Sequence, residues 1–319
     1  LFQPDVSPRW NGNLKKYKLV DGVIVDVNSN PAIDSTTGFF NITANSFWTT
    51  PRDLDGDSIN DFSNDGDDIK IGGFATQLTT PTTRKLYTST AASPIFGTSA
   101  PAQISFNVEN LDENNTNITG TPTLLGTDVT TADEARDIIN WARGGINDAP
   151  VTVPLFPPNY FVADVIHNPP SVVTYTTHTT TINGVTTVTG FDDTVFFGSN
   201  LGTFHAVNAE TGNEVFSFIP KELLPNLTVY REAVGSFSSK VYGLDAPMAV
   251  WRHDENEDGN ITTTGGSNDH VYIYQAMRRG GSSIYAFNVT NLADPKLMWQ
   301  IDGALAPIPN SNFLDLAQT

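Results

Sequence analysis

The clearest pattern of apolar and polar positions lies between Phe197 and Pro220, in the run FGSNLGTFHAVNAETGNEVFSFIP. A β-branched and aromatic run over residues 194–199 precedes a turn of Asn, Leu and Gly, residue types that tolerate positive φ. Apolar residues then alternate with a period of two over residues 204–209, and a Thr-Gly-Asn turn leads into residues 215–219. The pattern predicts an antiparallel meander of three strands.

A second stretch of the same kind covers residues 270–301. Its Ala-Phe-Asn at residues 286–288 aligns with the Ala-Val-Asn at residues 206–208, and the preceding strands and glycine turns then match. Residues 12–27 form a weaker third copy. A lone meander cannot bury both of its faces, so copies of it indicate an all-β β-propeller. The alternative is a set of unrelated hairpins that look alike because sheets share one residue pattern.

The propeller is expected to occupy residues 1–319 as a single domain, or as a fragment of one, because the last ten residues show no terminating element. One short helix is predicted from Thr131 to Ala142, with Glu134 at capping-box spacing. Two surface insertions are predicted. They are residues 111–130 and 176–190, and the second carries an Asn-Gly pair typical of a type I′ hairpin turn.

Composition narrows the function classes. The net charge is −18 and the pI is near 4.4, which argues against nucleic-acid partners and against docking on an anionic membrane surface. No stretch approaches the ~18 apolar residues of a membrane span, so no membrane insertion is expected. The absence of cysteine excludes disulfides, thiolate metal sites and cysteine nucleophiles. An excess of carboxylates is compatible with binding of divalent cations.

The first of two acidic loops has carboxylates at positions 1, 3, 5 and 9, on Asp53, Asp55, Asp57 and Asp61. The backbone carbonyl of Ile59 would be a further ligand at position 7. Alternate residues of a tight loop can supply the hard oxygen ligands that Ca²⁺ requires. Three further carboxylates could complete this site or form a neighbouring one: Asp65, Asp67 and Asp68.

The second acidic loop reads D-x-N-x-D-G, with its glycine at position 6 as in an EF-hand. Its candidate Ca²⁺ ligands are Asp254, Asn256, Asp258, Asn260 and Thr262. The acid of position 12 is missing, and a downstream acid such as Asp269 is its possible substitute. The alternative for both loops is an exposed turn without an ion. Clustered like charges are unfavourable unless neutralised, which favours the metal interpretation.

Catalytic motifs are weak. No pair of histidines has helical ligand spacing, and no nucleophile elbow is present. His205 lies within a predicted strand, where packing is the simpler role. We therefore expect no enzymatic activity and no catalytic residues.

The chain resembles PilY-type adhesins of type IV pili. The resemblance rests on the central meander, on the YGLDAP segment at residues 242–247, on the second acidic loop and on YIYQAMRRGGSSIYAFNV; WNGNLKKYKL, ARDIINWARG and ADVIHNPPSVV resemble the segments that lead into that region. The resemblance implies a propeller with modified, quinoprotein-like blades. It also implies an extracellular bacterial protein at the pilus tip, which supports pilus biogenesis, surface attachment and twitching motility.

The implied partners are minor pilins or the pilus tip and an unidentified host or abiotic surface receptor. The implied cofactor is Ca²⁺ in the second loop, where Thr262 departs from the acid expected at the ninth position. The first loop rests on spacing alone. Two alternatives stay open. One is a pyrroloquinoline-quinone dehydrogenase, since residues 206–216 are similar to a docking repeat of those enzymes with Phe in place of Trp. The other is a carbohydrate-binding surface protein, which would line up aromatic side chains on one exposed face.

Overall fold

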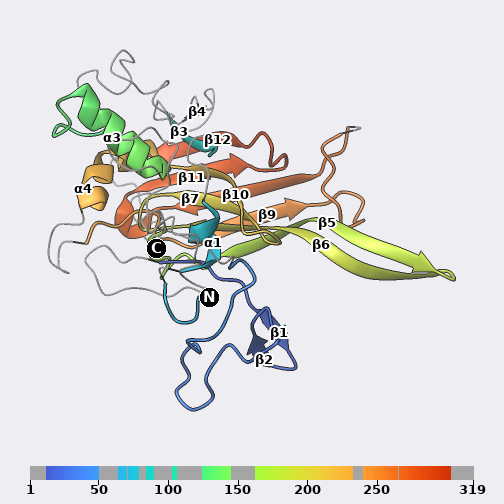
Figure 1. Cartoon of the computed structure of the whole chain (residues 1–319). Helices are drawn as coiled ribbons and strands as arrows, with labels where there is room; N and C mark the ends of the chain where they lie inside the picture. The colour runs from blue at the N-terminus through green and yellow to red at the C-terminus, as the bar shows by residue number, and fades with distance from the viewer. Residues whose placement is uncertain are drawn as a thin grey trace.

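The computed structural model of the chain describes residues 12–49, 64–69, 71–78, 84–89, 103–105, 124–144, 162–232, 240–264 and 266–302. These residues are mostly β, with a few short helices (Figure 1). The strands are β1 (Lys18–Val20), β2 (Val23–Val25), β3 (Leu86–Ser89), β4 (Gln103–Ser105), β5 (Ser171–Ile182), β6 (Val185–Gly198), β7 (Phe204–Asn208), β8 (Glu214–Phe218), β9 (Met248–His253), β10 (His270–Ala276), β11 (Ser283–Asn288) and β12 (Lys296–Asp302). The helices are α1 (Gly73–Gln77), α3 (Ala132–Arg143) and α4 (Leu227–Glu232), with 3-10 turns η2 (Lys221–Asn226) and η4 (Arg278–Gly280).

The described strands form three open sheets. They are the hairpin β1-β2, a four-stranded sheet β12-β11-β10-β9 and a six-stranded sheet β4-β3-β8-β7-β6-β5. Every pairing is antiparallel except that of β3 with β8. The predicted all-β class is confirmed to the extent that the described residues are mostly β. The propeller and the single-domain organisation stay predictions. The sequence predicts one helix. The described residues also contain α1 and α4, which at 5 and 6 residues are too short to show a helical period.

The two predicted meanders are present as β6-β7-β8 and β10-β11-β12. Each has a register shift at the same position of its middle strand, between Ala206 and Val207 and between Ala286 and Phe287. Each middle strand also ends in an asparagine whose side chain accepts from the following turn, at Asn208 and at Asn288. The shared β-bulge and shared turn show that the sequence alignment of the two stretches reflects a common structure.

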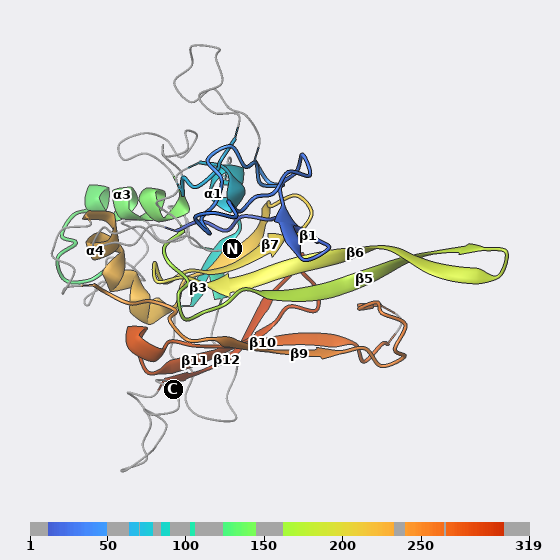
Figure 2. The same ribbon diagram turned by 90° about the horizontal axis from the view of Figure 1, so that it is seen from below.

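The two larger sheets lie over one another as layers (Figure 2), and side chains of β6, β7, β10 and β11 share one core. Aromatic rings join them. Phe204 stacks on Phe287 with ring centroids 4.9 Å apart, and Phe218 meets Phe287 at 5.1 Å. All three side chains are at most 3% exposed. Burial of rings of this size supplies much of the stabilisation between the layers.

The opposite face of the six-stranded sheet is also covered. Val195, Phe197 and Val207 pack there against Trp48 of the N-terminal segment and Phe74 of α1. Because successive residues of β6 and β7 point to opposite faces, burial of both faces requires an almost continuous apolar run. Residues 204–207 are all buried, so the period-two alternation expected over residues 204–209 does not separate a buried face from an exposed one.

Helix α3 has the predicted ends. Thr131 and Glu134 form a complete capping box, and Gly144 terminates the helix in the left-handed region with φ 105°. Its apolar side chains, including Ile138, Ile139 and Trp141, are buried in the core between the sheets. The helix therefore packs against the β structure, as its pattern predicts.

The predicted protruding hairpin is the outer part of β5 and β6, which extends well beyond the rest of the molecule (Figures 1 and 2). Asn183 and Gly184 form its turn with φ values of 53° and 78°, as a type I′ turn requires. The apolar run at residues 247–251 predicts a short buried strand. The structure differs from this expectation: β9 is the edge of its sheet and pairs, among the described residues, with β10 alone, so Trp251 is 51% exposed. No helix among the described residues is long and apolar enough to cross a membrane.

The two layers meet at three glycines in separate loops. Gly202 lies in the β6–β7 turn, Gly243 in the segment before β9, and Gly280 at the end of η4. A Cβ on Gly243 would collide with the backbone nitrogen of Gly202, and a Cβ on Gly280 would collide with the backbone carbonyl of Gly243. Only glycine permits this backbone-to-backbone approach.

A buried polar network surrounds the glycine contact. The Asn200 amide donates to Asp164 Oδ1 (2.5 Å) and to Asp245 Oδ1 (3.1 Å), and its Oδ1 accepts from the backbone N–H of Gly243. Both aspartates are 1% exposed. Lys240 pairs with Asp164 at 2.5 Å, and the imidazole of His167 lies 2.9 Å from Asp245 Oδ1. In the sequence, Asn200 and Asp245 look like ordinary turn residues. In the structure, the Asn200 side chain connects its own turn to the segments that carry Asp164 and Asp245.

We expect Gly243→Ala to lower the free energy of unfolding by about 3 kcal/mol, because the new methyl group forces two backbones apart. Gly190→Ala is the matched control. It also lies outside the left-handed region, and its Cβ would meet only His178, at 3.8 Å. Urea unfolding of both variants tests this. Equal free energies of unfolding of the two variants would show that the junction accommodates the added methyl group without loss of stability.

Candidate functional site

The second acidic loop connects β9 to β10 and is closed across its base by Asp269. One carboxylate oxygen of Asp269 accepts from the backbone N–H of Glu255 and the other from that of Thr262, both at 2.8 Å. These two backbone donors lower the pKa of Asp269 below its usual range. Asp269 thus ties the ends of the loop together, a structural role that its distance in sequence does not suggest.

The loop itself is folded by its own side chains. Asn256 Oδ1 accepts from the backbone N–H of Asp258, and Asp258 Oδ1 accepts from that of Asn260. Glu257 between them adopts φ 57°. Successive turns of this kind place alternate side-chain oxygens on the inner side of a tight loop, which is the arrangement that a calcium loop uses.

Asp254 begins the loop and is the best candidate ligand. Its Oδ2 accepts from the backbone N–H of Gly259 (2.9 Å) and lies 3.3 Å from the Arg252 guanidinium. Its Oδ1 is buried with no hydrogen-bond partner in the described part of the chain, and the side chain is 8% exposed. A buried carboxylate oxygen without a donor is a feature that a bound cation would satisfy. The residues therefore fit Ca²⁺ at this position.

Other candidate ligands of the second loop already form hydrogen bonds within the protein. Asn260 Oδ1 accepts from the backbone N–H of Thr177 on β5 (3.0 Å), and the Thr177 hydroxyl donates to the Gly259 carbonyl (3.2 Å). The backbone N–H of Thr262 is held by Asp269. Over the described ranges, no three His, Asp or Glu side chains are grouped as a metal site. The assignment of Asp254, Asn256, Asp258, Asn260 and Thr262 to Ca²⁺ stays a prediction.

The first acidic loop lies outside the described residues, together with its candidate ligands: Asp53, Asp55, Asp57, Ile59 and Asp61. Part of its neighbourhood is described. The Lys15 ammonium donates to the backbone carbonyls of Asp65 and Asp68, both at 2.7 Å, and lies 3.5 Å from Asp65 Oδ2. Burial lowers the pKa of Lys15, and Asp65 opposes that shift. A lysine inside the protein thus neutralises Asp65, one of the acids that could have completed a metal site.

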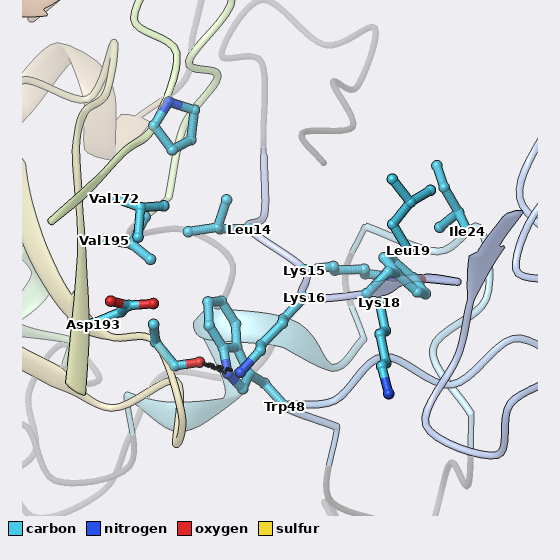
Figure 3. Close-up of a pocket in the computed structure, with 13 residues that line it drawn as sticks. Leu14, Lys15, Lys16, Lys18, Leu19, Ile24, Trp48, Val172, Asp193 and Val195 are labelled. Carbon is cyan, nitrogen blue, oxygen red and sulfur yellow. Dashed lines mark hydrogen bonds between the residues drawn. The ribbon is translucent and has the colours of Figure 1, made fainter. Parts of the chain in front are cut away.

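A cavity of about 610 Å³ lies between the β1-β2 hairpin and the adjoining β5 and β6 (Figure 3). Val172 and Val195 form part of an apolar wall. The Lys16 ammonium and the Trp48 indole N–H both donate to the carbonyl of Ala209, at 2.7 and 3.2 Å. The lining could accommodate an apolar group. The residues that line the cavity come from two distant stretches, 14–48 and 170–209, so no local sequence motif predicts the cavity.

The outer face of the four-stranded sheet carries a row of aromatic side chains. Trp251 packs edge to face against Tyr272 (5.6 Å), and Tyr274 contacts Trp299 (5.8 Å). His270 stacks on Tyr272 at 4.6 Å. Aromatic side chains on one exposed face are the feature that the carbohydrate-binding alternative predicts.

A buried charge cluster joins β7 and β8 of the six-stranded sheet to the residues just before β3. Arg84 pairs with Glu214 at 2.5 Å, and His205 Nδ1 lies 2.8 Å from Glu214 Oε1. His205 is fully buried against Phe74 and Phe197, and its Nε2 has no hydrogen-bond partner in the part of the chain that the structure describes. The expected packing role of His205 is confirmed, since its ring is fully buried and contacts the rings of Phe74 and Phe197.

The cluster has two pKa shifts. Burial lowers the pKa of His205, which Glu214 only partly offsets. Burial by itself raises the pKa of Glu214, but Arg84 and His205 outweigh it and bring the pKa down to about 2. His205 is therefore neutral in the folded protein and donates from Nδ1, while Glu214 is ionised.

Comparison of the sequence and structure with known proteins shows which class of protein the chain is similar to. No protein-family model matches it. It is similar in sequence to type IV pilus biogenesis factors, and the particular factor is PilY1. It is 30% identical over 110 residues to PilY1 of Pseudomonas aeruginosa (strain UCBPP-PA14), covering 34% of this chain and 9% of that protein. It is 28% identical over 109 residues to the PilY1 homolog of Xylella fastidiosa (strain Temecula1 / ATCC 700964), covering 33% and 8%.

The chain is thus a distant homologue of PilY1, and the resemblance read from its motifs is confirmed at that level. It spans less than a tenth of the length of these relatives. The crystal structure of the PilY1 C-terminal domain from Pseudomonas aeruginosa is similar at 25% identity with a TM-score of 0.23, over 36% of this chain and 20% of that one.

We expect acid to destabilise the protein in two steps. Below about pH 6.5 an unfolded histidine takes up a proton, whereas folded His205 stays neutral because its pKa is lowered, so the free energy of unfolding falls. Below about pH 4.5 the unfolded glutamate is protonated while Glu214 stays ionised, so stability falls further toward the Glu214 pKa of about 2. Urea unfolding of wild type and His205→Gln at pH 7 and 5 tests the first step; equal losses in the two proteins would contradict it.

Proposed function

We propose that the chain is part of a non-catalytic factor of type IV pili, located outside the cell and associated with the pilus tip. The observation that carries the proposal is the similarity over about a third of the chain to two PilY1 proteins from different bacteria. A net charge of −18 and the lack of cysteine are compatible with that setting. The proposed partners are minor pilins, and the proposed role is in pilus assembly, surface attachment and twitching motility.

We further propose that the second acidic loop binds Ca²⁺ through Asp254, Asn256, Asp258 and Asn260. The support is structural. The loop is preformed by its own hydrogen bonds, and Asp254 Oδ1 is buried without a donor among the described residues. Asn260 and Gly259 also contact Thr177 on β5. Calcium at this loop would therefore tie the β9–β10 connection to the edge of the neighbouring sheet, as a structural staple rather than an opening sensor.

For the pilus role, we expect the purified chain to co-sediment with sheared type IV pili and not with flagella of the same strain. Saturable binding to pili is the supporting result. No enrichment over the flagellar control would contradict a direct pilus role. Binding instead to glycans, lost in Trp251→Ala, would favour the carbohydrate-binding alternative that the aromatic face suggests.

For the calcium site, we expect metal analysis to find bound Ca²⁺ and EDTA to lower the melting temperature. A ligand present at about 100 times its Kd stabilises a protein by about 2.7 kcal/mol. Asp258→Ala should remove one ion and this EDTA effect. Asp34→Ala is the control, since Asp34 also accepts from a turn, at Thr36 and Thr37, but lies outside both loops. Unchanged calcium content in Asp258→Ala would exclude the second loop.

A further inference from the structure

The outer part of the β5–β6 hairpin, residues 178–190, stands clear of the body and is here named the arm (Figures 1 and 2). Strands β5 and β6 have 12 and 14 residues, but buried side chains occur only in the half nearest the body. Beyond Thr177 the side chains of both strands are mostly exposed on both faces. The arm is therefore a two-stranded ribbon without a core of its own.

The two edges of the ribbon differ. The edge of β5 is covered at its base, where the Tyr175 carbonyl accepts from the backbone N–H of Ile261 (2.8 Å) and Thr177 N–H donates to Asn260. The outer edge of β6 pairs with β7 only from Thr194 to Gly198. From Val185 to Phe191 the outer edge of β6 has no strand partner among the described residues, and Asp192 and Asp193 follow this stretch, where the Asp193 carbonyl accepts from the backbone N–H of Ala209 (2.9 Å). This is the longer open edge of the arm.

The arm also lacks the devices that normally protect an open edge. Natural edge strands carry Lys, Pro or inward-facing charges. Residues 179–191 contain no Asp, Glu, Lys, Arg or Pro, and consist mainly of Thr, Val and Ile. Ile182 is 67% exposed, Val185 63% and Val188 56%. Uncharged β-branched residues along an open edge favour pairing with another strand.

We propose that the outer edge of β6 pairs with the same edge of a second copy of this chain. A lone two-stranded ribbon is marginal in water, so an added strand stabilises it. Two identical antiparallel edges are self-complementary about a two-fold axis. The distribution of charge over the chain favours the arm as the place where two copies meet. The chain carries a net charge of −18, so two bodies repel one another, whereas residues 179–191 of each copy carry no charged side chain and meet away from the bodies.

The absence of cysteine from the chain allows a direct test. Single cysteines at Thr186, Thr187 and Thr189 scan the register of the paired edges. The expected result is a disulfide-linked dimer on mild oxidation, strongest at one position, because opposed Cα atoms must lie within about 7 Å. Thr36→Cys is the control, on an exposed turn of the body. Cross-linking no greater than that of the control at all three positions would overturn the proposal.

Light scattering across a concentration series gives an independent measurement. We expect a dimer whose Kd rises roughly ten-fold in Thr187→Lys, which adds a positive charge to each of the two paired edges, and stays unchanged in Thr36→Lys. A shortened variant with Asn-Gly in place of residues 179–189 should be monomeric and retain its melting temperature. A monomeric wild type, or a dimer that persists in the shortened variant, would overturn the proposal.

Discussion

The contact on which the rest of the structure depends is the backbone-to-backbone approach of three loops at the junction of the two sheets. Gly202, Gly243 and Gly280 belong to separate loops, and no side chain fits between them. Asn200 then binds Asp164 and Asp245, so that turns from both layers share one hydrogen-bond network. Satisfied buried networks are specific because each member leaves an unpaired polar group if it moves. The glycines set the distance between the layers and the network sets their register.

Packing of the layers follows from that junction. Once the turns are fixed, the middle strands β7 and β11 face each other, and Phe204 stacks on Phe287. The same register shift occurs where each middle strand pairs with the strand that follows it, which indicates that the two meanders are versions of one unit. The unit has two apolar faces. In β6 to β8 both are covered, whereas in β9 to β12 one face keeps Trp251 exposed.

Local signals predicted much of this fold. The capping box of α3, the type I′ turn at Asn183 and both meanders needed only short-range information, since strand period, turn chemistry and caps are local properties. The burial of β9 was predicted wrongly because its apolar residues resemble those of a central strand, and only the sheet order shows that it is an edge. The partners of Glu214 and Lys15 could not be predicted. Arg84 lies 130 residues from Glu214 and Asp65 lies 50 residues from Lys15, and a single sequence holds no record of such distant pairs.

The positively charged side chains near the two acidic loops show how far an acidic sequence motif can predict a metal site. The two acidic loops looked alike by spacing, yet the protein supplies its own positive charge near both. Lys15 lies among the carbonyls that follow the first loop, and Arg252 lies beside Asp254 at the start of the second. Each place has a buried carboxylate oxygen without a hydrogen-bond partner among the described residues, and the difference lies in its distance from the cation. At Asp65 that oxygen is Oδ2, which lies 3.5 Å from the Lys15 ammonium, whereas at Asp254 it is Oδ1, while Arg252 lies beside Oδ2. Arg252 and Gly259 share one oxygen of Asp254 and leave the other without a donor in the described structure. A cation bound there would join an oxygen that the protein does not itself satisfy, and it would do so in the loop that contacts the base of the arm through Thr177.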